Sequence, residues 1–366
     1  MSRLIFAFIV LIHGLIHLLG FVKEYKLAPV KQVAGIVLPG GMAKVIGLLW
    51  LVACLLFAFS AVAFVIKKDW WWIIGITGVV LSQVLIIMYW HDARFGTIVN
   101  VIVLAGCILS YGSWNFQRIW KKDLDSILLE RVANQHYTSP EKITGLPLVV
   151  QKWLGHSNIA GDRDIQNVYM KQEGVMLSKP EGKWMPFKAE EYFAVGKPGF
   201  IWIADVKAAS LVRMAGRDLY ENGKGHMLIR LYSLIPVVDS KGEKIDQGSM
   251  LRYLGEIIWF PVAALSPYIH WEPVDSTQAR ATMTYGGISA TGVFRFNTEG
   301  EVVSFESMRY FDRRDGATLE HWFISAGGYK EFGGMRVPSE ATVTWKMKDG
   351  DFTWLKLKVT AVKYSH

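Results

Sequence analysis

The sequence predicts a membrane α-helical bundle of four spans followed by a soluble α+β domain built on a curved antiparallel sheet. Three observations support this fold class. Hydrophobic residues make up 51% of the chain, but they are concentrated before about Gln117, and charged residues dominate after it. The apolar part contains four stretches that approach the ~20 residues a helix needs to cross a bilayer. From about Ile165 onward, apolar residues recur with a period of two, which is typical of half-buried strands.

The four predicted spans are Leu4–Val22, Val45–Ile66, Trp71–Trp90 and Thr97–Phe116. Tryptophan and tyrosine residues lie near the span ends, as they do at the two interfaces of a membrane. The loops after the second and third spans, KKD and HDARFG, are short, so we expect antiparallel neighbours in a four-helix bundle. The first apolar run is too long for a cleavable signal peptide and more spans follow it, so we expect it to be retained.

The net charge of +8 has two interpretations. A basic chain can bind nucleic acid, but no nucleic-acid motif is present, and we expect no such partner. Lysine and arginine residues flank the spans, where they meet anionic lipid. Six of them lie on the face that holds both termini and five lie on the other face, so the positive-inside rule favours cytoplasmic termini by one charge. Cys54 and Cys107 lie in apolar segments, which indicates buried thiols rather than a disulfide framework.

Polar side chains in the spans form a first candidate site. The two histidines of LIHGLIHLLGF are four residues apart, so they face the same direction on the first span. The end of the third span and the first turn of the fourth lie in the same half of the membrane as this pair. The residues that can converge there are His13, His17, His91, Asp92 and Asn100, with Gln83 and Ser82 deeper in the third span.

Three interpretations of these polar residues remain open. Interhelical hydrogen bonds can fix the packing of the bundle, at about 0.6–2 kcal/mol per contact. A metal or haem can bind to His13, His17, His91 and Asp92, because imidazole with carboxylate suits zinc, iron or copper. A proton or quinone site is the third interpretation, because polar groups in a bilayer are costly and tend to be functional. The HxxxH spacing lacks the glutamate of the HExxH zinc motif.

The segment 118–160 is predicted to connect a membrane domain, 1–117, to a β-rich soluble domain, 161–366. RIWKKDLDSILLERVAN has apolar residues at helical spacing and predicts an amphipathic helix. TSPEKITG is expected to form a loop, with its proline as a helix stop. LPLVVQKWLGHS is expected to form a short helix with proline at its start.

The soluble domain alternates apolar and polar residues in many short segments, among them KAEEYFAV, FIWIADVKA, ATGVFRFN and ATVTWKMKD. Tight turns such as NGKG, NTEG and KDGD separate them, so we expect an antiparallel sheet that curls into a barrel or half-barrel. One segment, IDQGSMLRYLGEIIWFPVAALS, has a helical apolar face instead. Such a helix between strands is expected to pack on the concave side of the sheet, which gives an α+β layout.

A second candidate site lies around this helix. We find no nucleophile elbow, phosphate loop, dinucleotide fingerprint or paired metal motif, which argues against an enzyme without deciding the question. A curved sheet covered by a helix can enclose an apolar cavity for a hydrophobic ligand. The residues expected to line it are Arg252, Glu256, Trp259, Phe260 and Trp271. Glu256 interrupts the apolar run YLGEIIWF and could act as an acid or base, although it could also simply pair with Arg252 four residues before it.

Distinctive motifs cover nearly the whole chain. They are HGLIHLLGF and SQVLIIMYWHDARFGTIVNV in the spans, and LPLVVQKWL, RMAGRDLYENGKGHMLIRL, GSMLRYLGEIIWFPVAALSPYIHWE and YKEFGGMRVPSEATVTW after them. As a set, these motifs make the chain resemble a family of bacterial integral membrane proteins of unknown function. That resemblance implies a multi-pass protein of the bacterial cytoplasmic (inner) membrane. The predicted curved sheet is similar in layout to the LolA-like half-barrel of lipoprotein carriers, an analogy at the level of the fold.

Three functions are therefore weighed. The first is a membrane-anchored binding protein whose β domain holds a lipid or another hydrophobic ligand. The second is a membrane metal, haem or redox enzyme that uses the His13, His17, His91 and Asp92 cluster. The third is a structural or sensory module in which the histidines only fix helix packing. The sequence leaves the oligomeric state open.

Overall fold

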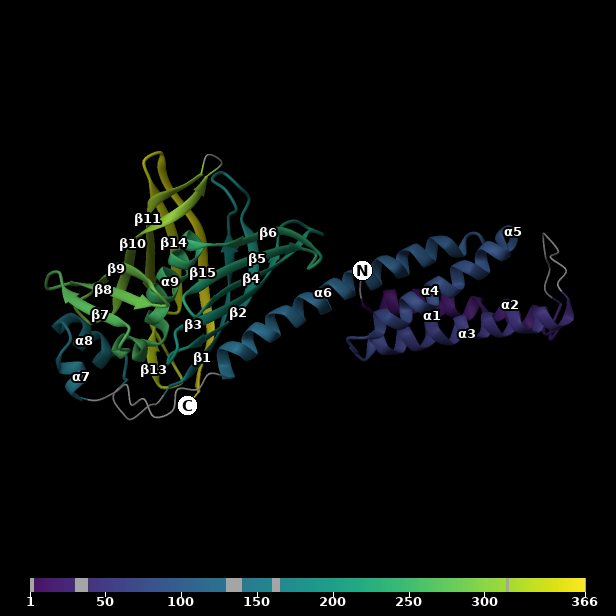
Figure 1. Ribbon diagram of the computed structural model, residues 1–366, viewed down its shortest axis with the longest axis horizontal. Helices are drawn as coiled ribbons and strands as arrows, with labels where there is room; N and C mark the ends of the chain where they lie inside the picture. The colour runs from purple at the N-terminus through teal and green to yellow at the C-terminus, as the bar shows by residue number, and fades with distance from the viewer. Residues whose placement is uncertain (1–2, 30–38, 130–139, 160–164, 314–315, 366) are drawn as a thin grey trace. The chain divides into compact units, whose positions relative to one another are not determined.

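The computed structural model describes residues 3–29, 39–129, 140–159, 165–313 and 316–365. The chain divides into two compact units, residues 1–116 and 117–366 (Figure 1). The segment that was expected to connect them therefore belongs to the second unit where it is described. The stretch at 130–134, at the end of the predicted amphipathic helix, lies outside the described residues.

The first unit consists of helices whose surface is apolar. Four helical segments are long and apolar enough to cross a membrane, namely Arg3–Glu24, Gly40–Val65, Trp71–Met88 and Gly96–Leu128. The four apolar helices expected from the sequence are thus confirmed. Large apolar side chains such as Phe8, Phe59 and Val80 remain exposed on them. The helices are α1 (Arg3–Ile16), α2 (Leu18–Glu24), α3 (Gly40–Val65), α4 (Trp71–Met88), α5 (Trp90–Ala93) and the first part of α6 (Gly96–Leu129).

Two irregularities in this unit lie at polar or aromatic residues. The first helix is interrupted at His17, whose amide donates to the Gly14 carbonyl at 3.0 Å, one residue closer than in an α-helix. A second interruption at Tyr89 separates α4 from α5. Close packing at Gly14 holds α1 against α3, because a Cβ there would lie 2.8 Å from Phe57 Cβ. The irregular turns therefore sit where the polar side chains of the bundle gather.

The second unit is built on an antiparallel sheet of 13 strands in the order β6-β5-β4-β3-β2-β1-β15-β14-β11-β10-β9-β8-β7. β12 (Lys330–Phe332) and β13 (Met335–Val337) form a separate two-stranded sheet. Strand residues alternate between the two faces, as the period of two predicts. The main strands are β1 (Asn167–Met176), β2 (Met185–Ala194), β3 (Gly199–Lys207), β4 (Arg213–Glu221), β5 (Lys224–Leu231), β6 (Ile235–Lys241), β7 (Ile269–Pro273), β8 (Gln278–Tyr285), β9 (Ile288–Phe296), β10 (Val302–Arg313), β11 (Gly316–Gly327), β14 (Glu340–Met347) and β15 (Gly350–Ser365).

The sheet curves around helix α9 (Glu243–Glu256), as Figure 1 shows. α9 contacts β4, β5 and β6 on one arm of the sheet and β8, β9 and β10 on the other. Strands far apart in the sheet order can reach one helix only if the sheet bends around it. Two short 3-10 helices, η1 (Ile257–Trp259) and η2 (Pro261–Leu265), follow α9. The expected half-barrel with a helix on its concave side is confirmed.

The two arms also touch through their hairpin turns. Gly223, between β4 and β5, and Gly286, between β8 and β9, have φ values of +77° and +60°. A Cβ on Gly286 would lie 2.7 Å from the Cα of Gly223. Such close approach of two backbones is open only to glycine. The turns therefore close the half-barrel at this point.

Two helices before the sheet pack against it. The last turns of α6 place Ile127 against Ala194, Ile201 and Leu219 on the outer face of β2–β4. α8 (Leu148–His156) buries Trp153 completely, beside Phe294. The predicted short helix at LPLVVQKWLGHS is therefore present. The predicted loop at TSPEKITG is wrong at Pro140–Thr144, which forms helix α7, because proline is well tolerated in the first turn of a helix. Its first two residues, 138–139, lie outside the described residues.

Candidate functional site

The two membrane histidines belong to one hydrogen-bonded network inside the first unit. His17 Nδ1 lies 2.7 Å from the His13 carbonyl oxygen, and His17 Nε2 lies 2.8 Å from Ser82 Oγ. Asn100 joins the two histidines, because its Oδ1 lies 2.8 Å from His13 Nε2 and its Nδ2 donates to Ser82 Oγ at 3.0 Å. Asn100 Nδ2 also donates to Gln83 Oε1 at 3.1 Å. The structure thus brings together the histidine pair and the polar residues of the third and fourth spans.

A cavity of about 480 Å³ lies beside this network. His13, His17 and Asp92 are among its lining residues. His91 is exposed on the short helix α5 and is not among the residues that line it. Three of the four side chains predicted as metal ligands therefore share a cavity, and the fourth points elsewhere.

A metal at these histidines stays a prediction. Within the described ranges, no group of three or more His, Cys, Asp or Glu side chains is arranged to hold a metal ion. Three of the four ring nitrogens of His13 and His17 are already hydrogen-bonded to protein groups. Two of these contacts, His13 with Asn100 and His17 with Ser82, are interhelical hydrogen bonds of the kind that the first of the three interpretations expects.

The second candidate site centres on Arg252, on α9 inside the half-barrel. Its guanidinium contacts three carboxylates, Glu191 at 2.7 Å, Asp218 at 2.8 Å and Glu256 at 2.9 Å. It also lies over the rings of Phe200 and Trp202, with its Cζ 4.8 and 5.2 Å from their centroids. The predicted pairing of Arg252 with Glu256 is present, but it is one part of a buried cluster rather than a pair on the helix surface.

This cluster contains more carboxylate than one arginine can neutralise. Burial, followed by the nearby Glu256, raises the pKa of Glu191 well above its usual value, and Arg252 only partly opposes this. Burial likewise raises the pKa of Glu256. A second guanidinium, Arg309, interacts with Asp218 and Glu256, and burial lowers its pKa to about 10. Two cations and three carboxylates balance when one proton resides on the Glu191–Glu256 pair.

Neighbouring polar side chains satisfy only some of the hydrogen-bond acceptors of the cluster. Gln172 donates to Glu191 Oε2 at 2.8 Å and accepts from Trp202 Nε1 at 2.9 Å. Among the described residues, Asp218 Oδ1 and Glu256 Oε2 have no hydrogen-bond donor. A proton on Glu191 can satisfy the Glu256 oxygen, since the two carboxyl groups are within hydrogen-bond reach. Asp218 Oδ1 then remains a buried acceptor that can receive a hydrogen bond.

The predicted aromatic residues lie in the apolar core of the half-barrel. Phe260 packs on Phe193, with ring centroids 4.5 Å apart. Trp259 donates from Nε1 to the Pro338 carbonyl at 2.9 Å, and Trp271 donates to the Ala264 carbonyl at 3.0 Å. All three are buried. They form the concave core together with α9.

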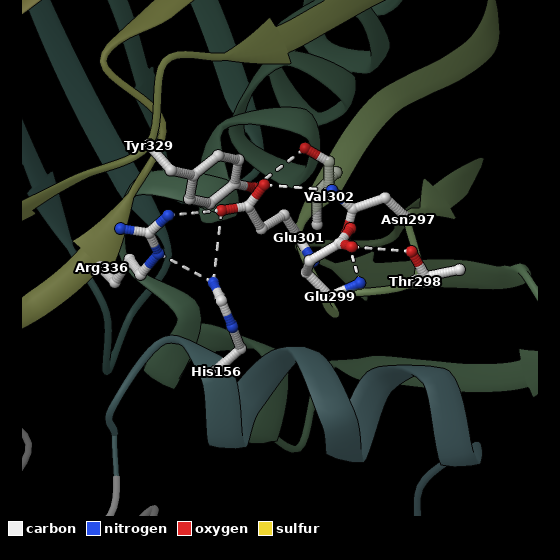
Figure 2. A network of polar contacts seen from close by, with 8 residues as sticks. All are labelled: His156, Asn297, Thr298, Glu299, Glu301, Val302, Tyr329 and Arg336. Carbon is white, nitrogen blue, oxygen red and sulfur yellow. Dashed lines mark hydrogen bonds and ion pairs between the residues drawn. The ribbon is translucent and has the colours of Figure 1, made fainter.

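Figure 2 shows a further polar network, which joins α8 to the turn between β9 and β10 and to β13. Arg336 donates to Glu301 at 2.8 Å and to His156 Nε2 at 2.9 Å, and Asn297 donates to Glu301 at 3.0 Å. Burial tends to raise the pKa of Glu301, but these hydrogen bonds outweigh it and lower the pKa. Lys152 on α8 also donates to the Thr298 carbonyl. Because Arg336 is half exposed, we interpret this network as a set of contacts that holds α8 against the sheet rather than as an enclosed binding site.

Sequence reasoning missed several members of both sites. Glu191 and Asp218 come from β2 and β4, far along the chain from Arg252. Strand parity could have found Glu191, because it shares the inward positions of Phe187, Ala189 and Phe193. In the bundle, Lys23 and Tyr89 were not predicted, although they line the cavity.

Comparison with solved structures finds five similar chains, and the three described below are all of low identity. A domain from Vibrio parahaemolyticus, described as an outer membrane lipoprotein-sorting protein domain, is 9% identical with a TM-score of 0.36 and covers 61% of this chain and 93% of its own. A LolA superfamily protein from Nitrosomonas europaea is 11% identical with a TM-score of 0.35, covering 60% and 95%. A DUF1329 family protein from Desulfovibrio piger is 9% identical with a TM-score of 0.36, covering 59% and 92%.

Comparison of sequences gives a family but no characterised relative. No curated protein matches the chain. The model of DUF6920, a family of unknown function, matches residues 144–364. The match includes α8 and the half-barrel, and the four apolar helices lie before it. Since it spans more than half of the sequence, the chain belongs to the DUF6920 family.

Proposed function

We propose that this protein is a membrane-anchored binding protein whose half-barrel holds a lipid or another hydrophobic ligand. The four apolar helices would anchor it in the bacterial cytoplasmic membrane, with the half-barrel on the side of both termini. The small excess of lysine and arginine on that side favours the cytoplasm.

The observation that carries the proposal is the charged cluster around Arg252 in an apolar interior. A buried ion cluster of this kind is a poor source of stability, because desolvation of the charges offsets their attraction. Sites where a few polar groups with shifted pKa values converge inside an apolar enclosure are instead typical of ligand binding. Here Arg252, Glu191 and Glu256 lie among Phe200 and Trp202.

The chemistry of the cluster suggests how a ligand would be held. The free acceptor Asp218 Oδ1 suits a hydroxyl or amine on the ligand head. The apolar tail would lie along the inner face of β3, between the sheet and the segment of α9, η1 and η2. Phe260 is completely buried there against Phe193, so α9 and the 3-10 helices must shift for the tail to enter. The touching turns at Gly223 and Gly286 mark where the two arms would separate.

Photolabelling in a membrane tests this proposal. The full-length protein is placed in vesicles of phosphatidylethanolamine and phosphatidylglycerol that contain palmitic acid with a mid-chain diazirine. After irradiation, we expect adducts on peptides from β3 and from residues 243–265. Adducts confined to residues 3–116 would refute a ligand site in the half-barrel.

A matched pair of variants distinguishes labelling that depends on the charged cluster from labelling of the protein surface. Glu256→Gln keeps the size of the side chain but removes one carboxylate of the cluster, and we expect it to lower half-barrel labelling severalfold. Glu272→Gln changes an exposed carboxylate whose partner Arg280 is 3.9 Å away, and labelling should not change. Equal labelling of both variants would exclude the cluster from ligand binding.

A further inference from the structure

The cavity of the four-helix unit opens on its apolar surface. Ile16 and Leu19 line the cavity and are nevertheless 55% and 57% exposed on the outside of the unit. Side chains of this kind would contact acyl chains in a membrane. A lipid-soluble molecule can therefore place its head at the polar end of the cavity while its tail lies between Ile16 and Leu19. The volume of about 480 Å³ lies within the range of small-molecule sites.

The hydrogen-bond network fixes which histidine atom is available inside this cavity. His17 Nδ1 faces a carbonyl oxygen, so it must donate, and His17 Nε2 must then accept from the Ser82 hydroxyl. Ser82 Oγ accepts in turn from Asn100 Nδ2, which leaves Asn100 Oδ1 to accept from His13 Nε2. His13 Nδ1 is then an unprotonated acceptor, and no described residue donates to it.

The carboxylate of Asp92 also lines the cavity and disfavours an anionic ligand. The other polar and aromatic groups favour a neutral ring. The cation at the cavity, Lys23, already lies 3.4 Å from Glu24 and 4.2 Å over the Tyr89 ring. Trp50 lies 5.3 Å from the His17 ring and 5.7 Å from the Tyr89 ring, so aromatic faces surround the polar end. Planar aromatic groups stack favourably on such faces.

We propose that this cavity binds a lipid-soluble molecule with a hydroxylated aromatic head, of the phenol or quinol class. The head hydroxyl donates to His13 Nδ1, the ring stacks among Trp50, His17 and Tyr89, and the tail extends past Ile16 and Leu19 into the membrane. This site is independent of the half-barrel, because every residue in it belongs to the first unit.

Three probes that share one tail separate the contributions of ring and hydroxyl. They are 4-decylphenol, decylbenzene without the hydroxyl, and 1-decanol without the ring. Native mass spectrometry of the full-length protein in detergent counts bound molecules at equal mole fraction of each probe. We expect one 4-decylphenol per chain. Decylbenzene should bind about tenfold more weakly, because its hydrogen bond to His13 Nδ1 is not made. 1-Decanol should bind about two- to tenfold more weakly, because it has no ring to stack on the aromatic side chains. Equal binding of decanol or decylbenzene would overturn the assignment of the ligand class.

Variants place the binding in the cavity. Val99→Phe fills part of it, whereas Val101→Phe makes the same change on a 60% exposed face of α6. We expect at least about tenfold weaker binding of 4-decylphenol only in Val99→Phe. His13→Gln keeps an amide nitrogen that can donate to Asn100 but loses the rigid ring acceptor Nδ1, which only the flexible amide oxygen could replace. It should weaken binding about tenfold without loss of the folded bundle.

The circular dichroism of each variant checks that the bundle is intact. Wild-type affinity in Val99→Phe would refute the cavity as the site. Wild-type affinity in His13→Gln would refute the role of Nδ1. If His13→Gln fails to fold, the comparison of Val99→Phe with Val101→Phe still decides the location.

Discussion

Removal of the Arg252 guanidinium is the sharpest perturbation of the half-barrel. In Arg252→Ala, Glu191, Asp218 and Glu256 all lose an ion pair of 2.7–2.9 Å. Glu191 and Asp218 are almost completely buried, so water cannot replace the lost partner. Breaking a buried pair from one side typically lowers the free energy of unfolding by about 3–5 kcal/mol. At about 2–4 °C per kcal/mol for a unit of this size, the melting temperature should fall by roughly 6–20 °C.

The assay is thermal unfolding of the full-length protein in detergent, followed by the near-ultraviolet circular dichroism of the tryptophan-rich half-barrel. Arg280→Ala is the matched control, because Arg280 is half exposed and pairs with Glu272 at 3.9 Å. It should change the free energy of unfolding by less than about 1 kcal/mol.

A compensated variant tests the cause. It combines Arg252→Met and Arg309→Met with Glu191→Gln, Asp218→Asn and Glu256→Gln, so that both cations and the three carboxyl groups are removed together. It should recover most of the lost stability, because a buried ion cluster can be replaced by neutral groups of similar volume at little cost. If the free energy of unfolding of Arg252→Ala lies within about 1 kcal/mol of the wild-type value, the cluster does not hold α9 against the sheet.

Three further outcomes are expected. Burial raises the folded-state pKa of Glu191, so the folded state holds more protons than the unfolded state. The free energy of unfolding should therefore fall as pH rises from the unfolded pKa through the folded pKa, by at most about 1.4 kcal/mol per pH unit for one proton. Glu191→Gln should flatten this dependence in thermal melts measured across pH, and an unchanged slope would exclude Glu191 as its source. Gly286→Ala forces a side chain into the left-handed region and against Gly223, so amide exchange should become faster in both hairpin turns. Gly287→Ala is the control, because the space around its Cβ is open; it should strain the β8–β9 turn and leave exchange in the β4–β5 turn unchanged. His17→Leu removes the hydrogen bonds to Ser82 and to the His13 carbonyl. It should lower the free energy of unfolding of the bundle in detergent by about 0.6–2 kcal/mol. An unchanged free energy of unfolding would show that the network does not stabilise the packing of the helices.

Local sequence patterns were sufficient for the elements and the fold class. The apolar runs predicted four helices, and the period of two predicted the strands. The helical apolar face of IDQGSMLRYLGEIIWFPVAALS predicted α9, although from Ile257 onward the segment forms two 3-10 helices. These patterns depend on neighbours within a few residues of each other, and both periods are intrinsic to the backbone. The short helix at Pro140 was missed because proline can begin a helix as well as follow one.

The sites were only partly predictable, because they depend on contacts between distant segments. The Arg252–Glu256 pair follows from helical spacing, but its partners on β2 and β4 follow from the bending of the sheet around α9. The same holds for the bundle. His13 and His17 share a face by spacing, whereas their partners Ser82 and Asn100 depend on the register of packed helices. His91 was expected to join them, but the break at Tyr89 turns α5 so that Asp92 rather than His91 lines the cavity.

The two interior polar networks differ in charge, and this difference separates their roles. The bundle network is complete with neutral side chains, apart from one acceptor on His13, so it can fix helix packing and still offer a single hydrogen bond to a neutral ligand. The half-barrel network has more carboxylates than cations and an unsatisfied oxygen on Asp218. An interior selected for stability alone would contain apolar residues at Glu191 and Asp218. Under the binding function proposed above, a ligand head that enters with α9 displaced would supply the donor that Asp218 Oδ1 lacks.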